Sequence, residues 1–301
     1  MSAKAPRKKI RWDLWMIVTV GVSIFYMLFL LYPLISMLSK SVIGEDGGFT
    51  WQYFAKVFHK KYYQRAIWGS LKISATVTLI TVLLATPLAY IMSTVKIRFA
   101  GALQILILVS SMSAPFIGAY AWIMLCGRNG TITNFLLNTF GFRLGDIYGF
   151  KGCVIVMSLQ LYSLVFMFVS GAFKNLDNSL IEASESLGCS GVRKIFKIVL
   201  PLSSAILAVI GLYYFVGHWN DFMTGLIYIT DDSKQPLQVV LQQLLLVAQG
   251  TGTNVNAAAQ QQAADQIKFG IIIVSTLPLL VLYPFLQKYF NKGVMLGAVK
   301  G

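Results

Sequence analysis

Four consecutive side chains in an otherwise apolar run could act on a solute. They are His218, Trp219, Asn220 and Asp221, within the apolar stretch 202–229. Ionisable residues in such a stretch usually face the interior of a helix bundle and mark an ion or substrate pathway. The Trp219 ring could stack on the apolar face of a sugar. The four residues are therefore candidates for a substrate pathway. The alternatives are a structural pair of His218 with Asp221 and ordinary packing of Trp219.

Motifs for catalysis or nucleotide binding are absent from the sequence. There is no G-x-x-x-x-G-K-[ST] phosphate loop, because the chain has no Gly-Lys dipeptide at all. No H-E-x-x-H or G-x-S-x-G motif occurs either. The sequence therefore predicts no catalytic residues and no ATPase activity in this chain.

The cysteines indicate neither a metal site nor a disulfide framework. They are Cys126, Cys153 and Cys189, an odd number at wide spacing with no C-x-x-C pair. No Cys/His cluster with zinc-ligand spacing accompanies them. We therefore expect no metal ligands.

The composition is that of an integral membrane protein. The 301 residues are 56% hydrophobic and 12% charged, with a mean hydropathy of +0.69, whereas soluble domains are about a quarter charged. The net charge of +14 would suggest a nucleic-acid partner in a soluble protein. Here most aromatic residues lie in or beside apolar runs, so we expect contact with membrane lipid and no nucleic-acid partner.

Six apolar runs approach the roughly 20 residues that a membrane-spanning helix needs. They predict an all-α fold whose spans cover about 14–36, 67–93, 101–125, 152–173, 202–229 and 268–287. The basic start "MSAKAPRKKIRW" resembles a signal peptide, but the apolar run after it is long and shows no clear cleavage site. We therefore expect a retained first helix.

The basic residues favour cytoplasmic termini. With six spans both ends lie on one side, and that side would carry 14 of the 25 basic residues. The margin is small because the first outer loop is also basic. The basic N-terminus, which usually dominates, favours the cytoplasm.

One predicted outer segment, residues 231–266, is long, nearly uncharged and rich in Gln, Asn, Ala and Gly. Structureless loops of this length are uncommon unless they are functional. We interpret it as a surface that docks an extracellular partner. A tolerated low-complexity insertion is the alternative.

The predicted cytoplasmic segment 177–201 is unusually polar for this chain and contains "EASESLGCSGVRKIFKIVLP" at 182–201. Asp177 and the next two residues are good N-caps, and Gly188 is placed to end a first short helix. Ser190 can begin a second helix, and Pro201 marks the start of the fifth span. The pattern predicts two short amphipathic helices. They either float on headgroups or, as the acids suggest, dock into a protein groove.

The same segment resembles the "EAA" loop of binding-protein-dependent ABC importer permeases. The pattern Glu-Ala-Ser-x-x-x-Gly, nine residues, then Ile-x-Leu-Pro is met by Glu182, Ala183, Ser184, Gly188, Ile198, Leu200 and Pro201. Ser184 replaces the commonest alanine, a change between two small residues. The resemblance implies the type I ABC importer permease fold with six transmembrane helices. It also implies that these residues couple the chain to a separate ATPase.

Two looser motifs resemble the carbohydrate branch of that family. "WNDF" at Trp219–Phe222 is similar to the maltose-type permeases, and the tail "KGVMLGAVKG" at Lys292–Gly301 is similar to permeases for complex saccharides. The resemblance implies an oligosaccharide or saccharide fragment as substrate and a bacterial cell membrane as location. Implied partners are a second homologous permease, two ATP-binding subunits and an extracellular solute-binding protein. ATP and Mg²⁺ would be bound by the partner ATPase, with no cofactor in this chain.

The expected organisation follows from these readings. Residues 1–66 would hold the cytoplasmic N-terminus, the first helix and the first extracellular loop. Residues 67–287 would form the permease domain with coupling loop 177–201, and 288–301 a cytoplasmic tail. An ion- or proton-coupled secondary transporter is the alternative function, but it would predict more intramembrane carboxylates and an internal repeat.

Overall fold

The computed structural model describes residues 14–43, 48–95, 97–112, 115–143, 145–174, 197, 200–248, 267–285 and 287. Apart from an isolated bridge between Ile43 and Phe49, the elements of this part are all helical, which confirms the predicted all-α class. They are α1 (Leu14–Tyr26), η1 (Met27–Leu31), α2 (Tyr32–Val42), α3 (Gln52–His59), α4 (Lys61–Thr94), α5 (Ala100–Ser110), α6 (Pro115–Cys126), α7 (Thr131–Phe140), α8 (Phe150–Lys174), α11 (Leu200–Trp219), α12 (Met223–Tyr228), η3 (Asp232–Lys234) and α13 (Leu237–Ala248). A C-terminal helix, Ile267–Phe285, follows.

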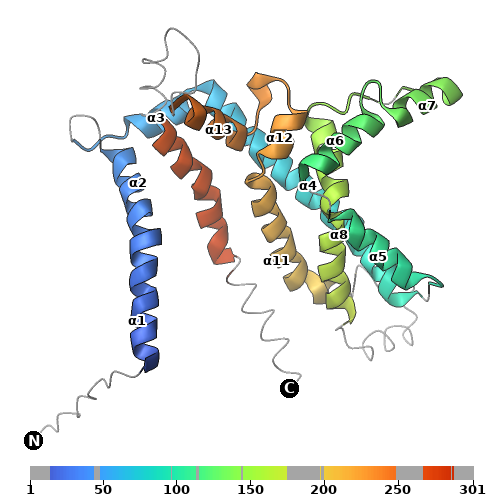
Figure 1. Cartoon of the computed structure of the whole chain (residues 1–301), viewed down its shortest axis with the longest axis horizontal. Coiled ribbons are helices and arrows are strands. Elements are labelled where there is room, and N and C mark those ends of the chain that lie inside the picture. Colours follow the sequence, from blue (N-terminus) through green and yellow to red (C-terminus); the bar gives the residue numbers. More distant parts are fainter. Residues whose placement is uncertain are drawn as a thin grey trace, which may run out of the picture.

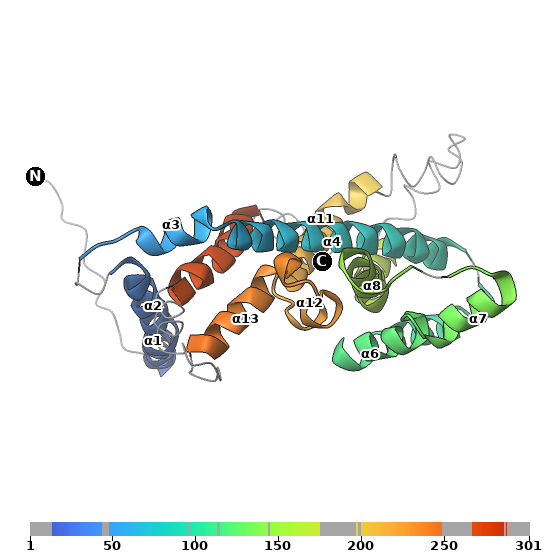
Figure 2. The same cartoon turned by 90° about the horizontal axis from the view of Figure 1, so that it is seen from above.

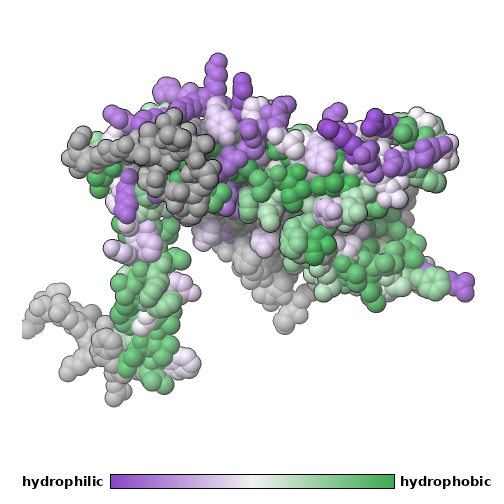
Figure 3. Space-filling model, turned by 45° about the horizontal axis from the view of Figure 1, so that its top comes forward, coloured by the Kyte–Doolittle hydropathy of each residue, from purple (hydrophilic) through white to green (hydrophobic). Residues whose placement is uncertain are grey.

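Four stretches are long and apolar enough to cross a membrane: Leu14–Val42, Lys61–Ser93, Phe150–Gly171 and Ile267–Phe285. The visible polar side chains gather along the upper rim in Figure 3, and an apolar surface lies below them. α1 begins, and the C-terminal helix ends, toward the bottom of Figure 1, whereas α3, α7, α12 and α13 lie along its top. This arrangement agrees with a membrane-spanning protein whose described ends share one side.

The stretches predicted as the third and fifth spans are each divided between two helices, and neither is among the four stretches above. The third is divided into α5 and α6, and α5 alone, at about 1.5 Å per residue, reaches about 17 Å. Pro115 begins α6, as expected for a residue without an N–H that disfavours helix before it. The fifth is divided into α11 and α12 at Asn220–Phe222.

Helix α4 organises the fold because it contributes to all three buried apolar clusters. One cluster joins α4 to α6, α8 and α12 around Val77 and Tyr228. A second joins it to α5, α8 and α11 around Phe166. The third joins it to α3, α13 and the C-terminal helix around Trp219 and Ile271. Figure 2 shows α4 crossing the middle of the molecule, with α8, α11 and the C-terminal helix beside it.

Small hydroxyl side chains are buried along α4, α8 and α11, three helices that contact one another. Ser74, Ser158, Ser163, Ser170 and Ser203 are all buried. In membranes, small residues at helix contacts allow backbones to approach closely, since lipid provides no hydrophobic drive for association. These residues explain the close crossing of α4 and α8 seen in Figure 1.

The first part of the predicted outer loop 231–266 is a helix, so the expectation of a structureless loop is wrong for residues 237–248. α13 packs on α4 and α12, and Leu237, Val239 and Val240 are buried. The sequence "PLQVVLQQLLLVA" has apolar residues at helical spacing, with Pro236 directly before the first turn. Residues 249–266 are not among those that the structure describes.

Candidate functional site

A pocket of about 420 Å³ opens where three chain segments meet. The segments are the first turns of α4, the residues from α6 to the start of α8, and the turn between α12 and α13. Its lining residues are Arg65, Trp68, Gly69, Lys72, Ile73, Arg128, Asp146, Tyr148, Gly149, Phe150, Ile229, Thr230, Asp231, Ser233 and Lys234. Each of the three segments belongs to, or borders, a loop predicted to lie outside the membrane. The pocket is therefore the place where the predicted outer loops converge.

The turn between α12 and α13 is fixed against α4 by two contacts. The main chain at Lys234 passes beside Gly69, and its oxygen would be in ordinary van der Waals contact, at 3.8 Å, with a Cβ at position 69. One residue further, the buried Ser70 Oγ accepts a 2.8 Å hydrogen bond from the main-chain N–H of Leu237. This N–H begins α13 and has no partner inside its own helix, so Ser70 acts as a helix cap from another element.

The opposite wall is fixed by Gly149. It has φ +91°, which favours glycine, and its N–H donates a 2.7 Å hydrogen bond to the main-chain oxygen of Tyr228. The Tyr228 hydroxyl in turn donates to the main-chain oxygen of Ala119 at 2.8 Å. The chain entering α8 is thus tied through α12 to α6.

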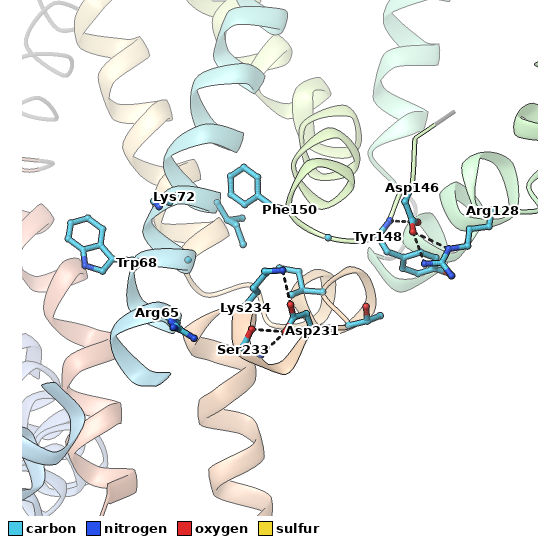
Figure 4. Close-up of a pocket in the computed structure, with 15 residues that line it drawn as sticks. Arg65, Trp68, Lys72, Arg128, Asp146, Tyr148, Phe150, Asp231, Ser233 and Lys234 are labelled. Atoms are coloured by element: carbon cyan, nitrogen blue, oxygen red, sulfur yellow. Dashed lines mark hydrogen bonds and ion pairs between the residues drawn. The ribbon is translucent and has the colours of Figure 1, made fainter. Parts of the chain in front are cut away.

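One ion pair closes the far end of the pocket (Figure 4). Arg128 donates from Nε and Nη2 to one Asp146 carboxylate oxygen, at 3.0 and 2.7 Å. The other oxygen accepts from the N–H of Tyr148 at 3.1 Å. These bonds lower the pKa of Asp146, with Arg128 as the main cause, and raise the pKa of Arg128. Both side chains are therefore ionised and paired at neutral pH.

A second ion pair lies in the turn beside α4. Lys234 Nζ is 2.7 Å from Asp231 Oδ2. The other oxygen, Oδ1, accepts from the N–H and the hydroxyl of Ser233, at 3.0 and 2.7 Å. Lys234 first and Ser233 second lower the pKa of Asp231 to about 2.

The two remaining cations of the pocket pair with no carboxylate among the described residues. Arg65 and Lys72 are exposed and lie on α4 seven residues apart, with Trp68 between them. Residues three, four and seven apart share one helix face. Trp68 is 63% exposed, so this face presents two positive charges and an indole ring.

The residues at 218–221 lie in different environments. Trp219 is 1% exposed, and its Nε1 donates a 2.8 Å hydrogen bond to the main-chain oxygen of Ser275 in the C-terminal helix. His218 is also buried. Its Nε2 has no hydrogen-bond partner within the described part of the chain, and its ring lies 5.8 Å from that of Tyr214. These two side chains face the packed interior.

Asn220 and Asp221 hold the break between α11 and α12. The Asp221 carboxylate accepts from the N–H of Thr224 at 3.1 Å and from its hydroxyl at 2.7 Å, which caps the first turn of α12. Asn220 is exposed, donates to the main-chain oxygen of Val216 at 3.1 Å and accepts from Gln238 Nε2 at 3.3 Å. None of these four residues lines the outer pocket.

Of the predicted coupling residues, the structure describes Leu200 and Pro201. They form the first turn of α11, where a proline is tolerated because the first N–H groups have no helical partner. This agrees with the predicted start of the fifth span. Glu182, Ala183, Ser184, Gly188 and Ile198 lie outside the described residues. Among the described residues, no group of three or more His, Cys, Asp or Glu could hold a metal ion.

A protein-family model matches residues 81–296, most of the chain. Its family is described as "Binding-protein-dependent transport system inner membrane component". The chain belongs to this family. The match includes the whole 182–201 segment, so the resemblance drawn from that segment is confirmed for this inner membrane component.

Two curated relatives come from Bacillus subtilis (strain 168). Protein LplC is 38% identical over 159 residues, which cover 52% of this chain and 53% of LplC. The polygalacturonan/rhamnogalacturonan transport system permease protein YtcP is 36% identical over 160 residues, covering 52% and 55%. The alignments thus span about half the length of these relatives.

A solved structure shares the fold over nearly the full length. It is that of a bacterial alginate ABC transporter in complex with a periplasmic protein that carries an alginate pentasaccharide. The TM-score is 0.70 at 18% identity, covering 91% of this chain and 92% of the other. This inner membrane component therefore shares the fold of a chain of that transporter complex.

Proposed function

We propose that the chain is a membrane-spanning permease subunit of an ATP-driven ABC importer for an oligosaccharide or saccharide fragment. The observation that carries the proposal is the 182–201 motif, which lies within the family match between α8 and α11. The motif connects the end of α8 to the start of α11. The pocket lies at the other end of α8. A segment there can transmit movement of an ATPase to the spanning helices.

Six spans and cytoplasmic termini are part of the proposal. α5 with α6 would serve as the third span, and α11 with α12 as the fifth. Both termini would then lie in the cytoplasm with the coupling loop 177–201 and the tail 288–301. The outer pocket would face the extracellular side, and residues 249–266 would contact the solute-binding protein.

The saccharide and the partners are argued from resemblance. YtcP is named for polygalacturonan and rhamnogalacturonan transport, and "WNDF" at Trp219–Phe222 resembles the carbohydrate branch. The importer would contain a second homologous permease and two ATPase subunits, which bind ATP and Mg²⁺, and would receive substrate from a solute-binding protein. His218 to Asp221 remain proposed pathway residues, acting through the break between α11 and α12.

Purification of the tagged chain from native membranes in mild detergent, with mass spectrometry of co-purifying proteins, tests the proposal. We expect a Walker-motif ATPase and a second permease. Glu182→Ala should release the ATPase, because it removes a charge-assisted contact, while the matched control Glu45→Ala, in the predicted outer loop, should retain it. Recovery of the chain alone, with ATP-independent uptake into vesicles, would contradict the proposal and favour a secondary transporter.

A further inference from the structure

The outer pocket carries more positive charge than its own carboxylates neutralise. It is lined by four cationic side chains and two carboxylates. Asp146 is occupied by Arg128, and Asp231 is occupied by Lys234. Arg65 and Lys72 are left for a ligand.

We propose that this pocket binds an acidic saccharide unit, with Arg65 and Lys72 contacting its carboxylate. The inference rests on the proposed function and narrows its substrate class from saccharides in general to carboxylate-bearing ones. A carboxylate suits these two side chains because charge-assisted hydrogen bonds from Arg or Lys to a carboxylate are about twice as strong as neutral ones.

The pocket also has the apolar surface that a sugar ring requires. Trp68, Tyr148 and Phe150 contribute aromatic rings to its walls. Trp68 lies one helical turn from each of the two cations along α4, as the labelled side chains in Figure 4 show. Ligand pockets usually combine such apolar walls with a few placed polar groups, and a volume of about 420 Å³ is within the usual range.

The paired carboxylates favour a sugar over a lipid headgroup. Oxygens of Asp146 and Asp231 line the same pocket, and a carboxylate only accepts hydrogen bonds. A sugar ring offers several hydroxyls that can donate to both carboxylates, whereas the phosphate of a headgroup only accepts, and the glycerol of phosphatidylglycerol adds just two hydroxyls. A ligand with one carboxylate and several hydroxyls therefore satisfies both kinds of side chain.

Direct binding to the importer tests the proposal without the solute-binding protein. The purified complex in phosphatidylcholine nanodiscs would be titrated calorimetrically with trigalacturonate and with its uncharged methyl ester. We expect the wild type to bind trigalacturonate at least about tenfold more tightly than the ester, a difference of about 1.4 kcal/mol, since hydrogen bonds to a charged group are stronger than those to a neutral one.

Matched variants assign that preference to the two cations. Arg65→Gln/Lys72→Gln should abolish the preference, and Arg65→Lys/Lys72→Arg should retain most of it. The control Lys60→Gln/Lys61→Gln removes two exposed charges beside the same helix start but outside the pocket lining, and should bind as the wild type does.

Three results would overturn the inference. The first is a wild type that binds both probes equally or neither of them. The second is a control pair that loses the preference as fully as the pocket pair. The third is a pocket pair that keeps the preference but, on purification from native membranes before transfer to nanodiscs, no longer co-purifies with the phosphatidylglycerol that the wild type carries, which would assign Arg65 and Lys72 to headgroups. ATP-driven uptake of a neutral saccharide without trigalacturonate binding would contradict the inference alone, whereas absence of the ATPase would contradict the proposed function itself.

Discussion

Trp219 Nε1 donates a 2.8 Å hydrogen bond to the main-chain oxygen of Ser275, joining the end of α11 to the C-terminal helix. Both partners are buried, in the region where α3, α4 and α13 also meet. The bond lies directly before the break between α11 and α12, and it links two helices that are far apart in sequence.

Trp219→Phe should lower the stability of the protein while still filling most of the space that the indole ring occupies. The phenyl ring is smaller and cannot donate, so we expect a loss of at least about 1 kcal/mol, the usual net value of a hydrogen bond, to which the small cavity beside the ring adds. Thermal unfolding of the detergent-solubilised complex measures it. Trp15→Phe, at a position 75% exposed on α1, is the control. Equal melting temperatures for both variants and the wild type would contradict the importance of the Trp219–Ser275 bond.

Ser70→Ala should loosen α13. The substitution leaves the N–H of Leu237 buried without its acceptor, which costs about 0.5–2 kcal/mol for a lost helix cap. Faster hydrogen exchange in residues 237–248 is the expected signal. Ser74→Ala provides a matched control, since Ser74 is equally buried one turn along α4 and its Oγ has no partner in the described part of the chain. Similar exchange rates for the two variants would argue against the capping role.

Gly225→Ala should separate α12 from α13. A Cβ at position 225 would lie 2.5 Å from Pro236 Cγ and 3.2 Å from Val239 Cγ2, and a proline ring has little freedom to move. Such overpacking costs about 1–3 kcal/mol, measurable as a lower melting temperature. Gly217→Ala, where a Cβ would meet nothing within 4 Å, should leave stability unchanged or slightly raised. If Gly225→Ala is equally harmless, the close packing of the two helices is not rigid.

Asp231 should contribute a pH-dependent stabilisation. Lys234 and Ser233 lower its pKa from 3.8 to about 2, so its contribution is complete above about pH 4 and is lost as the pH falls toward 2. Asp231→Asn removes the ionisable group. The difference in melting temperature between wild type and variant should therefore be constant at higher pH and narrow below pH 4.

Removing the partner tests the cause of that shift. In a Lys234→Gln background the main interaction that lowers the pKa of Asp231 is gone, so the narrowing should be smaller in total and should be complete at a higher pH. Because the ion pair is exposed, added salt should weaken the effect. A difference that does not vary with pH would contradict the role assigned to the pair.

Periodicity and length were sufficient to predict the long helices. The expected spans 67–93, 152–173 and 268–287 correspond to α4, α8 and Ile267–Phe285 within about six residues at each end. α4 begins earlier than expected because the polar turn from Lys61 to Arg65 continues the helix beyond the apolar run. Hydropathy marks the apolar part of a helix, not the helix itself.

Other features required information that apolar runs do not carry. The break at Asn220–Phe222 has a local signal, because Asp221 is a residue type favoured at helix N-termini, but an acid in an apolar run equally indicates a pathway residue. The outer pocket has no such signal. Its residues extend from Arg65 to Lys234 along the chain, and tertiary packing alone brings them together.

Gly188→Val should uncouple ATP hydrolysis from transport. If Gly188 ends the first coupling helix in a left-handed conformation, a β-branched side chain there is strained, and the segment can no longer fit the ATPase groove as a rigid lever. We expect the reconstituted importer to hydrolyse ATP while saccharide uptake falls at least about tenfold, equivalent to 1.4 kcal/mol of coupling. Gly171→Val is the control, because a Cβ at position 171 in α8 meets nothing within 4 Å. Full uptake by Gly188→Val would exclude a hinge at this glycine, whereas equal loss in both variants would point to damage to the membrane domain.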